Sequence, residues 1–240
     1  MLAENLKIVG ASVAEAASKA GRAAAEIELL AVSKTHPPEA VHEALDAGQF
    51  LFGESRVQEA RAKIPMLPGR ARWHFIGHLQ KNKVRHALPL FELFHGIDSL
   101  DIARDVNRIA EEAGAFPKVL LEVNVAGEAT KFGFTPERVR EQMEELLALA
   151  RIQIEGLMTI APFASEPEPS RPYFAALREL RERLQTEFRV PLPRLSMGMS
   201  GDYAVAIEEG ATLVRVGTAI FGKRSGKGWR PAGESDTNDV

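Results

Sequence analysis

LFHGIDSLDIARDVNRIAEEAGAFPKVLLEVN, residues 93–124, is the stretch that decides the fold of this chain. It opens with a short apolar run at Leu93–Ile97, and Ser99 then stands where it can cap a helix expected over residues 99–113. A second apolar run follows at Lys118–Asn124. Two strands joined by a helix are expected to be parallel, because the helix carries the chain back to the edge from which the first strand began.

The same alternation runs through the rest of the chain. Apolar runs that we expect to be strands occupy Glu28–Ser33, Phe50–Phe52, Arg72–Ile76, Leu93–Ile97, Lys118–Asn124, Gln153–Ile160, Arg194–Met197 and Thr212–Val216. Helical stretches are expected between them at residues 37–47, 56–64, 79–88, 99–113, 136–150, 171–188 and 202–209. Eight such units in about 200 residues suit a compact barrel. We therefore predict an α/β fold, a (β/α)8 TIM-type barrel, with a doubly wound open sheet as the alternative.

An extra helix is expected in front of the barrel. Apolar residues recur at helical spacing at Leu2, Leu6, Val9 and Val13. An alanine-rich continuation extends the predicted helix over residues 1–25. No fixed-period repeat or Gly/Ser-rich linker divides the chain, so we predict one domain over residues 1–224. Residues 225–240 are rich in Gly, Ser and Asp, and we expect a flexible tail there.

Composition excludes several classes of function. The 240 residues are 45% hydrophobic and 26% charged, as in globular rather than disordered proteins. A net charge of -3 argues against a protein whose main partner is nucleic acid. The chain has no cysteine and hence no disulfide, thiolate nucleophile or Cys-ligated metal. It also lacks an apolar run of the ~18–20 residues that a membrane span needs, and lacks a signal-peptide pattern, so we expect a cytoplasmic protein with no membrane partner.

A lysine closes the first predicted strand. Period-two alternation through residues 29–34 places Leu30, Val32 and Lys34 on one face. If that face points into the barrel, loss of water favours the neutral amine, which can attack a carbonyl as Schiff-base lysines do. The alternative is an exposed lysine that begins a loop.

The last two predicted strands end in a pattern that suits an anion. Arg215 closes the eighth strand on the same face as Leu213, and a guanidinium that points into a barrel mouth needs an acceptor. Gly217 and Thr218 follow with backbone N–H groups and a hydroxyl, and Ser200 follows the seventh strand. In this fold the loops after strands seven and eight frequently hold phosphate. The two segments together therefore predict a phosphate cup.

Other polar residues carry weaker signals. His74 and His78 have no carboxylate at metal-ligand spacing beside them, so packing or ordinary hydrogen bonding is expected rather than metal binding. Lys81, Lys83 and Arg85 form a basic helix face that we expect to be solvated. No Ser/His/Asp arrangement stands out, and we name no catalytic residue.

A strand-one lysine, a phosphate cup and a strand-eight arginine together suggest pyridoxal 5′-phosphate (PLP). The motifs that carry this combination are Ala31-Val32-Ser33-Lys34-Thr35, Phe52-Gly53-Glu54, Trp73–Gly77 with Leu79–Lys83, Leu195–Ser200 with Asp202, and Arg215–Gly222. On these motifs the chain, up to Gly222, resembles the pyridoxal phosphate homeostasis protein family.

The resemblance implies an alanine-racemase-like barrel that holds PLP as a Schiff base on Lys34. It implies that Ser200, Gly217 and Thr218 take the phosphate and that Arg215 faces the pyridine nitrogen. The implied role is vitamin B6 homeostasis, in which the protein stores, buffers or delivers PLP, with PLP-dependent apo-enzymes as expected partners.

Two further positions matter to the resemblance. Lys131, after the fifth predicted strand, matches a family lysine thought to matter for transfer of the cofactor, with a plain surface lysine as the alternative. Ser55 stands where the family usually has asparagine, in Gly53-Glu54-Ser55-Arg56, so a cofactor contact by that asparagine has no counterpart here.

We predict a cofactor-binding protein rather than an enzyme. Resembling racemases take a second acid/base from an added domain and a partner subunit, and the residues after Gly222 are too few for such a domain. Without that domain a monomer is expected. A small PLP-dependent racemase-like enzyme is the alternative. A phosphosugar isomerase would need a carboxylate base at the mouth, and the sixth strand ends Met158-Thr159-Ile160 without one.

Overall fold

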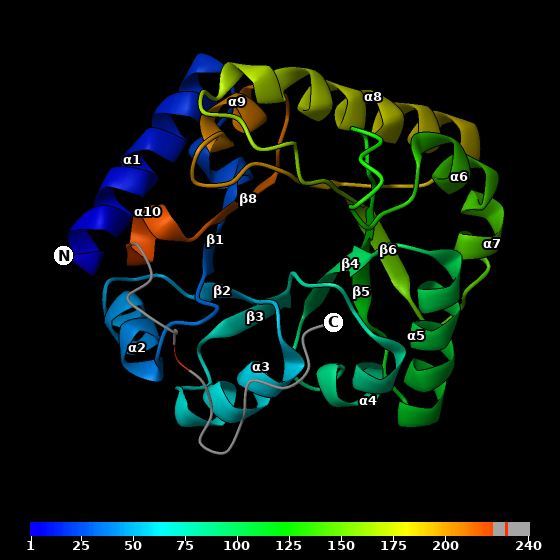
Figure 1. The fold of residues 1–240 in the computed structure, drawn as a ribbon, viewed down its shortest axis with the longest axis horizontal. Coiled ribbons are helices and arrows are strands. Elements are labelled where there is room, and N and C mark those ends of the chain that lie inside the picture. Colours follow the sequence, from blue (N-terminus) through cyan, green and yellow to red (C-terminus); the bar gives the residue numbers. More distant parts are fainter. Residues whose placement is uncertain (223–228, 230–240) are drawn as a thin grey trace.

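The computed structural model describes residues 1–222 and 229. Eight parallel strands close into a barrel in chain order, with β8 paired to β1 (Figure 1). The strands are β1 (Glu28–Val32), β2 (Leu51–Glu54), β3 (Arg72–Phe75), β4 (Leu93–Ile97), β5 (Lys118–Glu122), β6 (Gln153–Met158), β7 (Arg194–Ser196) and β8 (Leu213–Val216). The predicted barrel is confirmed, and the open sheet is wrong because β1 pairs with β2 on one side and with β8 on the other, which closes the sheet.

Helices follow the strands and cover the outside of the barrel (Figure 1). They are α1 (Leu2–Lys19), α2 (Pro38–Asp46), α3 (Val57–Lys63), α4 (Val84–Ala87), α5 (Leu100–Ala113), α6 (Pro136–Glu141), α7 (Met143–Leu147), α8 (Arg171–Phe188), α9 (Tyr203–Glu208) and α10 (Thr218–Phe221). The helix expected over residues 136–150 is interrupted at Gln142. Ser99 caps α5 as predicted, since its hydroxyl accepts from the Ile102 nitrogen at 3.4 Å.

Helix α1 ends at Lys19, earlier than the predicted 1–25. Gly21 has a φ of +67°, and the backbone nitrogen of Arg22 donates to the carbonyl of Ala17 at 2.9 Å. This left-handed turn closes the helix, because it satisfies carbonyls of the last turn that have no partner inside the helix. Helix α1 packs against α9 and α10, so it covers the wall beside β8.

The barrel interior has an apolar half and a polar half. The apolar half consists of Leu30, Leu51, Leu93, Leu120, Met158 and Leu213, with Val32 and Ile76 against them. The polar half comes from β3, β4, β7 and β8 and consists of His74, His95, Ser196 and Arg215, all buried. Because Leu30 and Val32 belong to the interior, their face of β1 points inward, and Lys34 follows two residues after β1 ends.

The predicted domain end at residue 224 and the predicted tail over residues 225–240 lie outside the described residues, apart from Trp229. The backbone nitrogen of Trp229 donates to the carbonyl of Thr35 at 2.7 Å. In the part of the chain that the structure describes, no helix combines the length and the apolar character needed to cross a bilayer.

Candidate functional site

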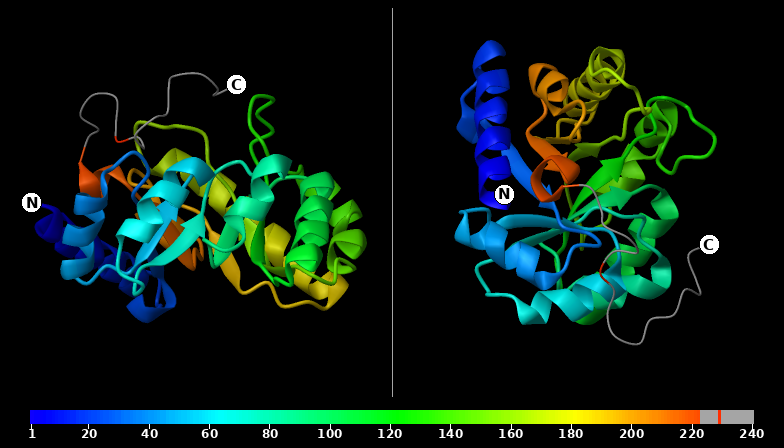
Figure 2. Two further views of the ribbon diagram at one scale, coloured as in Figure 1. Left: turned by 90° about the horizontal axis from the view of Figure 1, so that it is seen from below. Right: turned by 60° about the vertical axis from the view of Figure 1, so that its left-hand side comes forward.

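A cavity of about 340 Å³ lies at the carboxyl ends of the strands. Its lining includes all five predicted site residues, namely Lys34, Ser200, Arg215, Gly217 and Thr218. In the left view of Figure 2 the loop after β5 (green), the loop after β6 (yellow-green) and α10 (orange) rise on this same side of the barrel. The barrel thus brings β1, β8 and the loops after β7 and β8 to one opening, where active sites of this fold lie.

The turn that carries Lys34 is held by buried groups behind it. Thr35 has a φ of +66°, which is costly for a residue with a branched side chain. Its backbone nitrogen donates to Glu59 Oε1 at 2.6 Å, and the carbonyl of Ser33 accepts from Lys63 Nζ at 3.0 Å. Helix α3 therefore fixes the backbone on both sides of Lys34.

Those contacts belong to a buried ionic cluster behind β1 and β2. Lys63 is fully buried, and its Nζ also donates to Glu54 Oε1 at 2.9 Å and to Glu59 Oε1 at 2.7 Å. The Ser33 hydroxyl donates to Glu54 Oε1 at 2.7 Å. Burial raises the pKa of Glu54 to about 7, and the charge of Lys63 opposes the rise. The sequence signal for this cluster was the Glu59–Lys63 spacing of four on one helix, which our sequence analysis did not use.

The loops after β7 and β8 meet at Ser200. Its hydroxyl oxygen accepts from the backbone nitrogens of Gly217 at 3.2 Å and Ala219 at 3.4 Å. Gly198 has a φ of +91°, and a Cβ there would lie 2.6 Å from the Cβ of Ala206, so only glycine allows the turn that presents Ser200. The result is a small group of N–H and hydroxyl donors on the edge of the cavity.

Arg215 lies on the inner wall and is held by neutral acceptors. Its Nη1 donates to the carbonyl oxygen of Ser196 at 2.8 Å and to the Ser196 hydroxyl at 2.7 Å, and its Nη2 donates to the carbonyl of Thr159 at 2.8 Å. Burial lowers the pKa of Arg215 to about 10, so the group remains a cation at neutral pH. Two of its five N–H donors are left over within the described residues.

A carboxylate at the mouth escaped the sequence analysis. Glu122 closes β5 on the same face as Leu120, which belongs to the interior. Burial raises the pKa of Glu122 to about 7, the charge of Asp98 adds to the rise, and Arg215 opposes it. Glu122 was not predicted from the sequence, where only the end of β6 was considered for a carboxylate, although alternation places Glu122 on the same face as Leu120.

Lys131 and Ser55 lie beside the mouth but do not line the cavity. Lys131 Nζ donates to Glu128 Oε1 at 2.7 Å and to the carbonyl of Ala161 at 3.3 Å, so it ties the loop after β5 to the loop after β6. The Ser55 carbonyl oxygen would lie 2.2 Å from a Cβ at Gly77, so the backbones of the two loops approach closely there.

The two histidines weighed for metal binding both form hydrogen bonds. His78 Nδ1 lies 2.7 Å from Asp98 Oδ2, and its ring stacks on Phe132 with centroids 3.9 Å apart. His74 Nδ1 lies 3.1 Å from His95 Nε2. Among residues 1–222 and 229, no three or more His, Cys, Asp or Glu residues form a group that could hold a metal ion.

Comparison with known proteins bears on this site. The family model of the alanine racemase N-terminal domain matches residues 10–225. The chain is 46% identical to the pyridoxal phosphate homeostasis protein of Aquifex aeolicus, over 92% of this chain and 97% of that protein. PipY of Synechococcus elongatus PCC7942, at 39% identity, has TM-scores of 0.84 without PLP and 0.79 with PLP bound, and the match covers 92% of this chain and 100% of PipY. Alanine racemase of Clostridium difficile 630, at 18% identity, has a TM-score of 0.72 over 95% of this chain and 58% of its own, a likeness of fold alone.

Proposed function

Because this chain belongs to the pyridoxal phosphate homeostasis protein family, we propose that it binds PLP in the mouth cavity and acts in its homeostasis by storing, buffering or delivering it. One observation carries the proposal: an amine, a guanidinium and a cluster of N–H and hydroxyl donors all line one cavity of about 340 Å³. The relative with PLP bound, PipY, supports it.

The residues present fit the cofactor at three points. Lys34 lies in the turn after β1 and lines the cavity, and it holds the cofactor as a Schiff base. Ser200, Gly217 and Thr218 supply donors for a phosphate, and Gly217 has no side chain to fill the space next to Val32. Arg215 has donors left for a ring nitrogen.

The same residues favour holding the cofactor over using it. PLP, when bound, supplies an electron sink for amino-acid chemistry, and that sink is strongest when the pyridine nitrogen is protonated. Arg215 offers only donors and a positive charge, both of which favour an unprotonated nitrogen. We propose a monomeric carrier that hands PLP to apo-enzymes. Phe163, which lines the cavity and is 99% exposed, lies where such an enzyme would contact the rim.

Borohydride reduction of the PLP-loaded protein, followed by peptide mapping, tests the proposal. We expect a visible absorption band that reduction abolishes, and a pyridoxyl group on Lys34. Lys131→Ala, which removes a lysine 29% exposed beside the mouth, is the matched control and keeps the label on Lys34. A label found mainly on Lys131 or Lys81 contradicts the assignment of Lys34, and absence of any label contradicts covalent binding.

A small PLP-dependent racemase-like enzyme is the second candidate, and Glu122 favours it. This carboxyl lies on the inner face of the barrel with a pKa near neutrality, where a general acid or base is effective. Exchange of the α-hydrogen of amino acids for deuterium, measured with PLP-loaded protein in D₂O, decides between the two. The carrier function predicts exchange no faster than with free PLP, whereas the enzyme predicts fast exchange that Glu122→Gln removes.

A further inference from the structure

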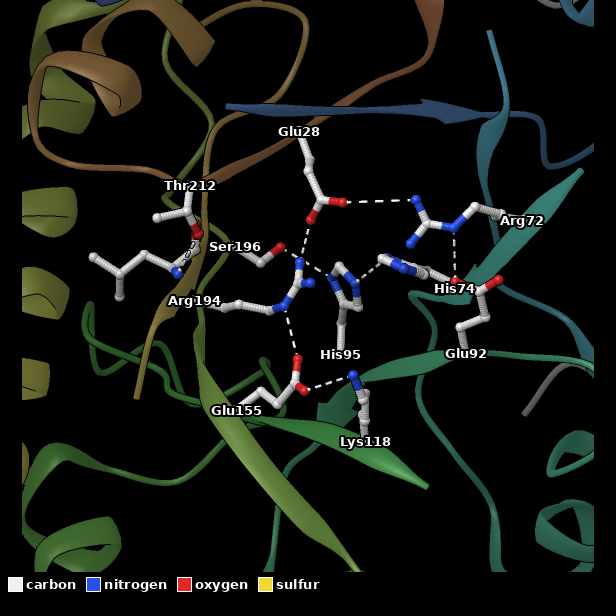
Figure 3. Close-up of polar contacts among 11 residues, drawn as sticks. Glu28, Arg72, His74, Glu92, His95, Lys118, Glu155, Arg194, Ser196 and Thr212 are labelled. Carbon is white, nitrogen blue, oxygen red and sulfur yellow. Dashed lines mark hydrogen bonds and ion pairs between the residues drawn. The ribbon is translucent and has the colours of Figure 1, made fainter. Parts of the chain in front are cut away.

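A buried chain of hydrogen bonds leads from Arg215 across the barrel. Figure 3 shows the part of it that runs from Ser196 through His95 to His74. Arg215 Nη1 donates to the Ser196 hydroxyl at 2.7 Å, the same hydroxyl lies 2.9 Å from His95 Nδ1, and His95 Nε2 lies 3.1 Å from His74 Nδ1. All four side chains are at most 5% exposed. They come from four strands, β8, β7, β4 and β3, so residues far apart in sequence form one continuous polar path.

The far end of this path is the floor of the barrel. His74 lines a second cavity, of about 410 Å³, with Arg72, Lys118, Glu155 and Arg194. Figure 3 shows the ion pairs around it. Arg194 pairs with Glu28 and, at 2.7 Å, with Glu155, and Lys118 Nζ lies 3.0 Å from Glu155. Arg72 Nε lies 2.9 Å from Glu92. Three cations, Arg72, Lys118 and Arg194, and three anions, Glu28, Glu92 and Glu155, thus close the floor. Their charges balance, so no net charge pulls the His74 ring out of the hydrogen-bond chain.

The hydrogen-bond chain has only one direction in which every group is satisfied. An arginine can only donate, so the Ser196 oxygen accepts from Arg215. Within the described residues the only other partner of that hydroxyl is His95 Nδ1, so the Ser196 proton must go to this nitrogen. His95 then carries its own proton on Nε2 and donates it to His74 Nδ1. Both rings are therefore neutral, with the proton on Nε2.

Burial agrees with this protonation state. It lowers the pKa of His74 to about 3, and the charges of Arg194 and Arg72 act in the same direction. It also lowers the pKa of His95 well below the usual range, with His74, Arg215 and Arg194 as further causes. An imidazolium at either position would place a second positive charge in the same barrel interior as the Arg215 guanidinium, which is unfavourable.

We propose that His95 and His74 are positioning residues for Arg215, acting through Ser196. By accepting the serine proton, His95 turns a lone pair of the hydroxyl toward Arg215, and this fixes the guanidinium edge that remains for a ligand in the mouth. This hydrogen-bond chain fixes the orientation of its side chains and does not conduct protons, because the Arg215 guanidinium at its end does not deprotonate at physiological pH. The effect of Arg215 orientation on bound PLP rests on the proposed function. The tautomers of His95 and His74 follow from the hydrogen bonds alone and are independent of that function.

The first test uses the protein without cofactor, so it is independent of the proposed function. Two-bond ¹⁵N–¹H correlation spectra of the labelled protein, assigned with the His74→Gln and His95→Gln variants, report the tautomer of each ring. We expect both rings to be neutral with the proton on Nε2 from pH 5 to pH 8. A proton on His95 Nδ1, or an imidazolium at either position in this range, overturns the proposal.

The second test compares His95→Asn with His95→Leu in PLP-loaded protein. The two side chains branch alike at Cγ, so packing losses are similar, but only asparagine keeps an oxygen near the position of Nδ1 that can accept from Ser196. Loss of the acceptor removes the constraint on the Ser196 hydroxyl, so among the residues that the structure describes Arg215 is then held only by the carbonyls of Ser196 and Thr159. We expect His95→Leu to shift the visible absorption band of bound PLP and to weaken PLP binding roughly tenfold, the scale of one hydrogen bond to a charged group. We expect His95→Asn to keep an absorption band and a PLP affinity close to those of the unaltered protein.

Thr212→Val serves as the control for Ser196→Ala. The Thr212 hydroxyl accepts from the Leu195 nitrogen at 2.9 Å, and in the part of the chain that the structure describes no hydrogen bond links this hydroxyl to Arg215, so its removal leaves the spectrum unchanged. Ser196→Ala should shift the spectrum as His95→Leu does. If His95→Asn and His95→Leu give equal spectra and equal affinities while both lower the unfolding temperature, the histidine is merely structural and the proposal is wrong.

Discussion

The hydroxyl oxygen of Ser200 lies 3.2 Å from the backbone nitrogen of Gly217. The two residues belong to loops after different strands, β7 and β8, and the contact joins these loops. The same oxygen accepts from the nitrogen of Ala219, so Ser200 satisfies two N–H groups at the start of α10. An anion that takes over these donors needs little rearrangement, which lowers the entropic cost of binding.

The double variant Ser200→Ala, Thr218→Val should weaken PLP binding at least about tenfold, because each lost bond to a charged phosphate contributes on the order of 1.5–3 kcal/mol. Binding of pyridoxal, which has no phosphate, should change little. Fluorescence titration with both compounds measures the two dissociation constants. Thr186→Ala, an exposed hydroxyl on α8, is the control and should leave both constants unchanged. Similar dissociation constants for pyridoxal and PLP in the unaltered protein would show that no phosphate cup exists.

The pyridine nitrogen of bound PLP should be unprotonated at neutral pH. In the proposed site Arg215 would face this nitrogen with donors and a positive charge, and a second cation beside that charge is unfavourable. The ¹⁵N chemical shift of labelled PLP in the unaltered protein measures the protonation directly. In Arg215→Gln, which lacks the positive charge, the nitrogen should take up a proton at a higher pH. A protonated nitrogen in the unaltered protein at pH 7 would contradict the role assigned to Arg215.

The stability of the cofactor-free protein should fall between about pH 4.5 and pH 7 through Glu122. Burial raises the pKa of this carboxyl from 4.5 to about 7, so the folded state binds its proton more tightly than the unfolded state. The stabilisation from the protonated Glu122 carboxyl is complete below the pKa of the unfolded state. It is lost as the pH rises through the pKa of the folded state. A shift of this size corresponds to about 3 kcal/mol at most.

Glu122→Gln, which cannot ionise, should therefore flatten this part of the profile and should be more stable than the unaltered protein at pH 8. Denaturant unfolding at several pH values measures the free energy of unfolding. Glu137→Gln removes an exposed carboxyl and is the control. An identical slope in Glu122→Gln and the unaltered protein would exclude a raised pKa at this position.

Lys63→Met should lower the free energy of unfolding by about 3–5 kcal/mol, because it leaves buried carboxylates without their cation. Lys19→Met is a matched control. Both lysines lie 2.7 Å from a glutamate four residues earlier, but Lys63 is fully buried and the side chain of Lys19 is 64% exposed. Urea unfolding of the two variants should show a large loss for Lys63→Met and almost none for Lys19→Met. Equal losses would mean that burial does not set the strength of these pairs.

The sequence predictions rested on two patterns, the succession of apolar runs and helical stretches and the period-two alternation within strands, and the structure shows both. Apolar runs separated by helical stretches predicted eight strands, and all eight are present with ends that differ by at most a few residues. Period-two alternation placed Lys34 on the same face as Leu30 and Val32, and Arg215 on the same face as Leu213, and both residues line the mouth cavity. The length of α1 was wrong, because the turn at Gly21 depends on a left-handed backbone that apolar spacing does not encode.

Alternation within a single strand fixes which of its side chains share a face, so this much could be predicted from the sequence. Which face points inward, and which inward groups meet, depends on how the strands close into the barrel. His95 lies 21 residues from His74 and 101 from Ser196, yet barrel closure and strand register bring all three within hydrogen-bond distance. Burial then set the pKa values of Glu122 and the two histidines, and burial depends on what the other strands and helices place around a group. Contacts across strands are properties of the closed barrel, so no local pattern could predict them.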